Sequence, residues 1–304
     1  MKKREIAQFR YYQMEEDEIV LALIGREWIR EYGKDVDYLH YHNYLEIGIC
    51  YAGKGDVILG EKTYPFEAGS IMIIPPYFLH TTNSIKGTKV YWEWFYFDVE
   101  TILSEQYDTN MIKAKYLKQK IYEKSHYMNV QKNEKLKRIL ELIRLECLEK
   151  VEFYQESLRG LTQTLLVEII RINAKEKENY EKNMFLAPAI QYIEEHFFEE
   201  IYIPQLAEVC NMSESYFRKL FVSSIHMKPI DFINFVRIQK ACHLIKRTEK
   251  SMEEIAYRVG FGTISTFNRN FKKLFGISPY QWKKSNENRA DNLKHYRISA
   301  HKGW

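Results

Sequence analysis

The sequence predicts a multidomain protein with a β-rich N-terminal half, a helical pair after it and an all-α C-terminal third. Short runs of β-branched and aromatic residues, separated by Gly and Pro, fill residues 17–99, which is typical of an antiparallel sandwich or barrel. From Gln131 onward the apolar residues recur at helical spacing instead. The predicted regions are a β domain at 1–115, a helical region at 116–182, an all-α domain at 183–284 and a polar tail at 285–304.

Alternation and turn signals predict the strands of the β domain. The run YLEIGICY, which begins at Tyr44, alternates, and the glycines from Gly53 to Gly55 supply a turn. DVILGEKTY then predicts a hairpin, and VYWEWFYFD, which ends at Asp98, alternates again. The span from Ile19 to Tyr32 fits either a strand or a helix.

Two apolar stripes predict two amphipathic helices in the helical region, joined as antiparallel neighbours by the short connection EKVEF. The charged run from Asn173 to Asn183 predicts a linker or a fraying helix end. Such stripes are expected whether the helices pack within one chain or between two copies of it. The sequence therefore does not distinguish intramolecular packing from a homodimer. Their residues are Leu136, Ile139, Leu140, Ile143 and Cys147, and then Leu158, Leu161, Leu165, Ile169 and Ile172.

Composition argues against several classes of protein. The longest apolar runs fall short of the roughly 20 residues of a membrane span, and no apolar signal segment follows the basic N-terminus. The four cysteines are dispersed without a CxxC pair, which favours reduced thiols. No Ser-His-Asp, Cys-His or phosphate-loop arrangement is present in the sequence. We therefore expect a cytoplasmic protein that is not an enzyme, uses no cofactor and has no membrane partner.

Charge is distributed unevenly along the chain. From Ile201 to Trp304 there are 18 Lys and Arg against 8 Asp and Glu, a net charge of +10. The first 200 residues carry 27 against 33, a net charge of −6. A basic C-terminal third on an acidic body predicts a polyanionic partner for that third alone.

The segment IPQLAEVCNMSESYFRKLF, which ends at Phe221, predicts two short helices joined by a turn. Pro204 suits the first turn of a helix, because its missing N–H has no intrahelical partner there. Asn211 tolerates the positive φ of a tight turn, and Ser213 then caps the second helix. This is the helix-turn-helix pattern. Its inward-facing residues are Leu206, Ala207, Cys210, Phe217, Leu220 and Phe221.

The same pattern returns about 50 residues later in MEEIAYRVGFGTISTFNRNF, which ends at Phe271. Gly260 takes the turn, and Phe267 and Phe271 take the place of the two earlier aromatic anchors. The connector PIDFINFVRIQKACHLIKRT predicts a helix that, at about 1.5 Å per residue, holds the two second helices about one DNA turn apart.

The run IAYRVGFGTISTFNRNFKKLFGISPYQWKK resembles the signature of the AraC/XylS family of bacterial transcription regulators, and the match extends from Leu186 to Lys284. The resemblance implies a seven-helix domain that binds double-stranded DNA with two recognition helices in successive major grooves. Arg can bind guanine, Asn adenine, and Ile the thymine methyl group. The alternative is that the charged residues are ordinary solvated helix charges. The implied contact residues are Ser215, Arg218 and Lys219, then Ile264, Ser265, Asn268 and Arg269, with phosphate contacts from Lys272 and Lys273.

The first helix-turn-helix unit departs from the family pattern after Phe221, its second aromatic anchor. VSSIH replaces the usual basic pair and turn glycine, so His226 stands where Gly is usual. We expect a strained or softened turn there, and fewer phosphate contacts from the first helix-turn-helix unit than from the second.

His40, His42 and Glu46, followed by Gly53 and the distant His80, have the spacing H-x-H-x3-E-x6-G and resemble the cupin metal motif. The second part of that motif is imperfect, since Tyr77 replaces its usual Gly. Regulators of the AraC/XylS family carry a cupin-like jelly roll with a similar run and no metal. We therefore predict a cupin-like jelly roll without a metal. The predicted effector site has Glu46, His42 and His80 as polar groups and Trp92 or Trp94 as a stacking face.

The alternative is a metal-dependent enzyme domain, fused to the DNA-binding domain, in which His40, His42, Glu46 and His80 hold a divalent ion. The family resemblance itself implies a small-molecule effector, with a carbohydrate as the favoured class, and transcriptional activation. A homodimer is expected, and RNA polymerase is a further partner if the protein activates.

Overall fold

The computed structural model describes residues 8–12, 14, 17–33, 39–129, 131, 133–175, 186–225, 227–288 and 298–300. Contacts divide the chain into two compact units, formed mainly by Met1–Asn179 and Tyr180–His295, and each is described by itself. None of the described helices is long and apolar enough to cross a lipid bilayer.

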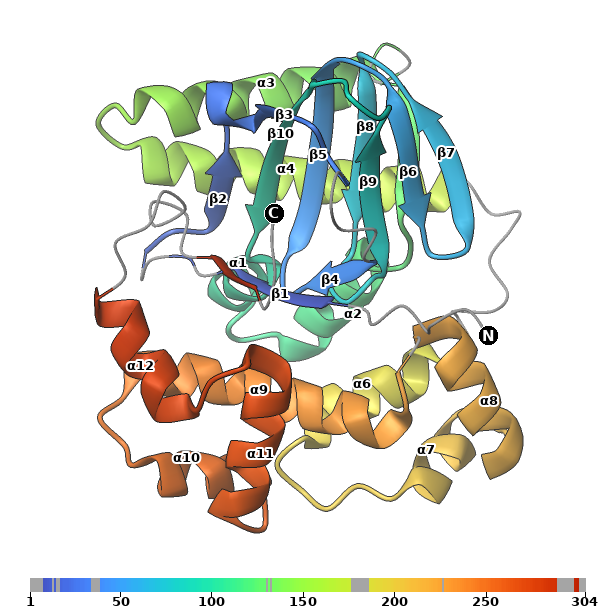
Figure 1. Ribbon diagram of the computed structural model, residues 1–304, viewed down its shortest axis with the longest axis vertical. Coiled ribbons are helices and arrows are strands. Elements are labelled where there is room, and N and C mark those ends of the chain that lie inside the picture. The colour runs from blue at the N-terminus through green and yellow to red at the C-terminus, as the bar shows by residue number, and fades with distance from the viewer. Residues whose placement is uncertain are drawn as a thin grey trace. The chain divides into compact units, whose positions relative to one another are not determined.

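The first unit is built on two β-sheets (Figure 1). Its strands are β1 (Gln8–Tyr12), β2 (Val20–Leu23), β3 (Ile29–Arg30), β4 (His40–His42), β5 (Leu45–Ala52), β6 (Gly55–Leu59), β7 (Lys62–Phe66), β8 (Ser70–Ile74), β9 (His80–Ser84), β10 (Val90–Phe97) and β11 (His126–Asn129), with Ile298 of β12 (Ile298–Ala300). One sheet has the order β12-β1-β4-β9-β6-β7, and the other has the order β11-β8-β5-β10-β2, with β3 also paired to β10. Strand β1 pairs with β4 in parallel, whereas β4, β9, β6 and β7 pair antiparallel. The predicted antiparallel β domain is confirmed.

Strand β5 shows why the predicted alternation works. Ile47 and Ile49 pack in a core shared with helices, whereas Cys50 packs in the core between the sheets. Glu46 and Cys50 are four residues apart on the same strand, so their side chains lie on the same face, and Glu46 also points into the sandwich. The predicted hairpin is β6 and β7, and Gly53, with φ 97°, joins β5 to β6 in the other sheet. The ambiguous span from Ile19 to Tyr32 contains strands β2 and β3 and the short 3₁₀ helix η1 (Arg26–Trp28).

The described residues of the first unit form four α-helices: α1 (Val99–Gln106), α2 (Met111–Ile121), α3 (Glu134–Glu149) and α4 (Tyr154–Lys175). The sequence analysis predicted α3 and α4 but not α1, α2 or β11. In Figure 1, α3 and α4 run across the sheet that contains β10, β5 and β8, and the stripe residues Leu136 and Ile169 share a core with Ile47 and Phe95. The predicted stripes therefore pack within one chain. Of the predicted linker, residues 176–183 lie outside the described residues.

In its described part, the second unit contains seven helices, as the family resemblance implied: α6 (Ala187–His196), α7 (Ile203–Val209), α8 (Glu214–Ile225), α9 (Pro229–Arg247), α10 (Met252–Arg258), α11 (Ile264–Phe275) and α12 (Pro279–Asn288). Helix α9 contacts α6, α8, α10 and α11, so the connector is also the centre of this unit. The aromatic anchors Phe217, Phe221, Phe267 and Phe271 are fully buried. His226 lies outside the described residues.

Candidate functional site

The two helix-turn-helix units, α7–α8 and α10–α11, share one turn geometry. Asn211 has φ 55° and Gly260 has φ 90°, both in the left-handed region. The N–H of the residue that follows each of them donates to an alanine carbonyl five positions earlier, at 2.9 Å in both units. This is the Schellman turn that ends a helix with a positive-φ residue. The predicted turns at Asn211 and Gly260 are confirmed.

Each second helix begins at a side-chain cap. The Ser213 hydroxyl accepts from the N–H of Tyr216 at 3.4 Å, and the Thr263 hydroxyl accepts from the N–H of Thr266 at 3.1 Å. Such caps satisfy N–H groups that have no partner within the helix. The caps and the Schellman turns together fix the direction in which α8 and α11 leave their turns.

The predicted DNA-contact residues lie on the faces of α8 and α11 that the core leaves open. All of them are exposed except Ile264, which is half-buried at the start of α11. A helix with buried aromatic anchors on one side and polar residues on the other can present that polar side to the major groove. The exposed residues are Ser215, Arg218 and Lys219 on α8, and Ser265, Asn268, Arg269, Lys272 and Lys273 on α11.

Two of these cations are engaged within the chain. Arg218 contacts Glu214 one turn earlier in α8 at 2.6 Å, and Lys273 contacts Asp231 of α9 at 2.8 Å. Both lysine and arginine are largely exposed, and exposed pairs contribute only about 0–1 kcal/mol. A DNA phosphate can therefore replace either carboxylate at small cost.

Arg237 lies in the middle of α9 and positions the second helix-turn-helix unit, a role that the sequence did not predict. Its guanidinium donates to the carbonyl oxygens of Phe197 and Glu199, both at 2.7 Å, just beyond the end of α6. A Cβ on Gly260 would lie 2.5 Å from the same Phe197 oxygen and 3.0 Å from Arg237 Nε. The visible signal was an arginine in the middle of the connector helix, directly after the predicted core residue Val236.

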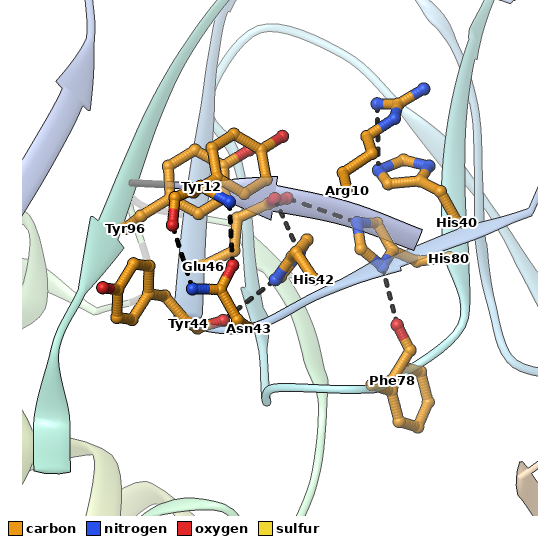
Figure 2. A network of polar contacts seen from close by, with 10 residues as sticks. All are labelled: Arg10, Tyr12, His40, His42, Asn43, Tyr44, Glu46, Phe78, His80 and Tyr96. Atoms are coloured by element: carbon orange, nitrogen blue, oxygen red, sulfur yellow. Dashed lines mark hydrogen bonds and ion pairs between the residues drawn. The ribbon is translucent and has the colours of Figure 1, made fainter. Parts of the chain in front are cut away.

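In the first unit, three residues of the predicted effector cluster meet inside the sandwich (Figure 2). His42 Nε2 lies 2.9 Å from Glu46 Oε2, and His80 Nε2 lies 3.5 Å from Glu46 Oε1. All three side chains are buried, and one potential ligand atom from each lies within 4.8 Å of the other two. They come from β4, β5 and β9, so strand pairing brings them together.

Backbone carbonyls fix the orientation of both imidazoles. His42 Nδ1 lies 2.9 Å from the Tyr44 oxygen, and His80 Nδ1 lies 2.8 Å from the Phe78 oxygen. Since a carbonyl only accepts, both Nδ1 atoms carry the proton and donate it. Each Nε2 is left facing the Glu46 carboxylate, as Figure 2 shows.

Burial and charge oppose one another in this cluster. Burial alone would raise the pKa of the Glu46 carboxyl, but His42 and His80 outweigh it and hold that pKa well below its ordinary value. Burial lowers the pKa of His42, against the opposing effect of Glu46. The directions favour an ionised Glu46 carboxylate beside a His42 imidazole that takes a second proton less readily than usual.

His40, the fourth residue of the predicted metal alternative, is bound elsewhere. Its Nε2 lies 3.2 Å from Arg10 Nη1, and since guanidinium only donates, that nitrogen accepts. Arg10 is brought there by the parallel pairing of β1 with β4. Tyr12 of β1 also borders the cluster, since its ring meets that of His42 edge-on with centroids 5.7 Å apart. Its hydroxyl accepts from Tyr96 at 2.8 Å, and its ring stacks on that of Tyr96. Nothing local in the sequence signals these contacts.

The two predicted stacking residues lie in the core between the sheets. Trp92 is fully buried and Trp94 is 5% exposed, and their rings stack on one another with centroids 4.9 Å apart. Trp92 also meets Phe66 edge-on, and Trp94 Nε1 donates to the Tyr32 hydroxyl at 3.3 Å. A ligand can reach these indoles only if this core opens.

Comparison with known proteins gives two family matches. Residues 27–167 match the AraC-like ligand binding domain, and residues 206–285 match a helix-turn-helix domain. The first range contains the buried cluster of His42, Glu46 and His80, and the second begins within α7 and contains the rest of both helix-turn-helix units.

The chain is also similar to individual regulators and to solved structures. The chain is 26% identical over 251 residues to the uncharacterized HTH-type transcriptional regulator YfiF of Bacillus subtilis, covering 79% of this chain and 77% of that one. It is 23% identical over 248 residues to the HTH-type transcriptional activator RhaS of an Enterobacter species, covering 79% and 85%. Among solved structures, fatty-acid-bound ToxT of Vibrio cholerae is 13% identical, covering 87% of this chain and 93% of that one at a TM-score of 0.46. The C-terminal domain of AraT from Geobacillus stearothermophilus is 30% identical, covering 37% and 93% at a TM-score of 0.32.

Proposed function

This chain belongs to the AraC-type family of transcription regulators, and on that premise we propose that a small molecule bound in its jelly roll controls how its helical domain binds DNA. The chain has a ligand-binding domain and a sequence-specific DNA-binding domain. We propose how the two domains are coupled, which residues contact the DNA and the effector, and what class of molecule the effector is.

One observation carries the DNA part of the proposal: the same turn, cap and pair of buried aromatic anchors occur twice around one connector helix. Helix α9 has 19 residues, which at about 1.5 Å per residue spans roughly 28 Å, close to one turn of DNA. We assign base contacts to the exposed residues near the starts of α8 and α11, and phosphate contacts to Lys272 and Lys273. The assigned base contacts are Ser215, Arg218, Lys219, Ile264, Ser265, Asn268 and Arg269.

For the effector, we assign Glu46, His42 and His80 as the polar anchors and Trp92 or Trp94 as the apolar face. The support is a cluster of buried polar groups, on the inner side of a sandwich, within the part of the chain that matches a ligand-binding family. A carboxylate and two imidazoles can accept or donate to several hydroxyls, so a carbohydrate is the first class to test. The named relatives are regulators, so we assign the domain to sensing rather than to catalysis. A chromosomal partner implies a cytoplasmic location.

We also propose a homodimer, through a face of α3 that the intramolecular core leaves open. Leu142, Leu145 and Leu148 recur every third residue and are 50%, 45% and 48% exposed. Val151 and Phe153, in the turn after α3, extend this outer stripe. Apolar side chains at such spacing suit a helix–helix contact between two copies. RNA polymerase is a further partner if the protein activates.

A ligand screen on the full-length protein tests the effector proposal. Binding to the native state raises the melting temperature, by about 2.7 kcal/mol of stabilisation at 100 times Kd. A carbohydrate that stabilises the wild type should also change its affinity for a DNA site selected from random sequence. Glu46→Gln should lose both effects, whereas Glu61→Gln, in the exposed β6–β7 turn, should keep them. An effector response that survives in Glu46→Gln would contradict the assignment.

A further inference from the structure

Three buried atoms of the first unit lack a hydrogen-bond partner and lie together. They are His42 Nε2, Glu46 Oε2 and His80 Nε2, and among the described residues none has a partner of hydrogen-bond geometry, although they approach to ion-pair distances. Buried polar atoms in folded proteins nearly always have a partner. Three such atoms from three strands, within 4.8 Å of one another, indicate one shared partner.

Proton positions restrict what that partner is. Both Nδ1 protons are donated to backbone carbonyls, so each Nε2 presents a lone pair unless its ring takes a second proton. Two lone pairs and a carboxylate that face the same point repel one another, and a cation at that point removes the repulsion.

We propose that His42, Glu46 and His80 hold one divalent transition-metal ion, through Nε2 of each histidine and a carboxylate oxygen. This rests on the proposed ligand site and deepens it by naming an occupant. Imidazole and carboxylate together suit zinc and its neighbours in the first transition row. A ligating histidine usually donates its other N–H to a carbonyl or carboxylate, and both histidines do so here. Two nitrogens bound to tetrahedral zinc are about 3.3 Å apart. The three ligand atoms here lie within 4.8 Å of one another, so the side chains would draw closer together around the ion.

The ligand set has three members and excludes His40, although all four residues share the sequence motif. His40 Nε2 accepts from Arg10, and a guanidinium beside that nitrogen repels a metal ion. His40 is therefore a matched control. Its ring centroid lies 4.1 Å from that of His80, so a substitution there perturbs the same neighbourhood without removing a ligand.

The test uses full-length protein, stripped with a chelator, dialysed and titrated with Zn²⁺ by calorimetry, or with Co²⁺ by visible absorption. We expect one ion per chain and a higher melting temperature when it is bound. His42→Ala and Glu46→Gln should lower the affinity by more than about 100-fold, beyond the 10- to 100-fold typical of outer-shell changes. His40→Gln should stay within about tenfold of the wild type.

Other results overturn the proposal. If the wild-type protein binds less than one ion per chain at micromolar Zn²⁺, the proposal is overturned. This measurement does not depend on whether the variants fold. Equal losses in His40→Gln and His42→Ala overturn the three-ligand set. Circular dichroism of each variant separates lost ligands from lost structure. Carbohydrate binding is measured on the same samples, so a metal-free protein with an intact effector response overturns this inference alone. A metal-loaded protein that responds to no effector overturns the effector proposal alone.

Discussion

Arg144 of α3 forms a two-contact ion pair with Glu93 of β10, with Nε 2.7 Å from Oε2 and Nη2 3.1 Å from Oε1. Glu93 is fully buried, and the Tyr91 hydroxyl donates to it as well. The arginine side chain is 32% exposed. This pair joins the helical layer to the sheet at a charge that has no access to water.

Arg144→Ala should lower the free energy of unfolding by about 3 kcal/mol, because it leaves a buried carboxylate without its cation; the partial exposure of Arg144 favours the low end of the usual range. Arg138→Ala removes an exposed pair with Glu134 in the same helix and should cost under about 0.5 kcal/mol. Urea unfolding measures both. Equal costs would show that Glu93 gains nothing from Arg144.

Gly260→Val should destabilise the second unit by at least about 1–3 kcal/mol. A β-branched residue is strained at φ 90°, and its Cβ would lie 2.5 Å from the Phe197 oxygen. Asn211→Gly, at the same place in the first turn, should have little effect, because glycine adopts φ 55° freely. Thermal melting and DNA affinity report both changes. A valine variant with an unchanged melt would mean that Gly260 does not hold this turn.

Arg269→Ala should cost about 1–3 kcal/mol at a selected DNA site and relax the preference at one base pair. Lys272→Ala should weaken selected and random DNA about equally, as expected for a phosphate contact. Lys272 is a better control than Lys273, which also pairs with Asp231. Anisotropy titrations on both DNAs compare them. Sequence-independent losses in both variants would make Arg269 a phosphate contact.

The segment from Asn183 to Trp304 should bind DNA without the first unit, since both helix-turn-helix units and α9 lie within it. Its affinity should fall by about 10³-fold between 50 and 200 mM salt if it makes roughly six phosphate contacts. Lys272→Ala should lower the salt slope by about one. Binding that does not change with salt, in a segment that is folded by circular dichroism, would contradict this interface.

Leu145→Glu should convert a dimer to a monomer without unfolding the chain, because it places a charge in the exposed outer stripe of α3. Lys137→Glu changes a partly exposed position of α3 that lies more than one turn before Leu142, outside the outer stripe, and should leave the dimer intact. Light scattering during size-exclusion chromatography gives the mass of each. A wild type that is monomeric at micromolar concentration, or a Leu145→Glu variant that stays dimeric, would reject this face.

The sequence by itself determined what depends on near neighbours in the chain. Helical spacing and turn signals located α3, α4 and α7 to α11, and alternation located β5 and β10. Asn211 and Gly260 could be assigned to turns because few residues tolerate a positive φ. The repeated pattern of turn and aromatic anchor predicted two helix-turn-helix units, since each unit is complete within about 20 consecutive residues.

Only the tertiary structure decided which distant residues meet. Arg10 reaches His40 because β1 pairs with β4, and that pairing separates His40 from the three residues that share its motif. The inner stripes of α3 and α4 face the sheet, and the outer stripe of α3 faces outward, although both have helical spacing. Spacing tells which residues share a face, but the partner of that face depends on how sheets and helices assemble, and no local interaction specifies that.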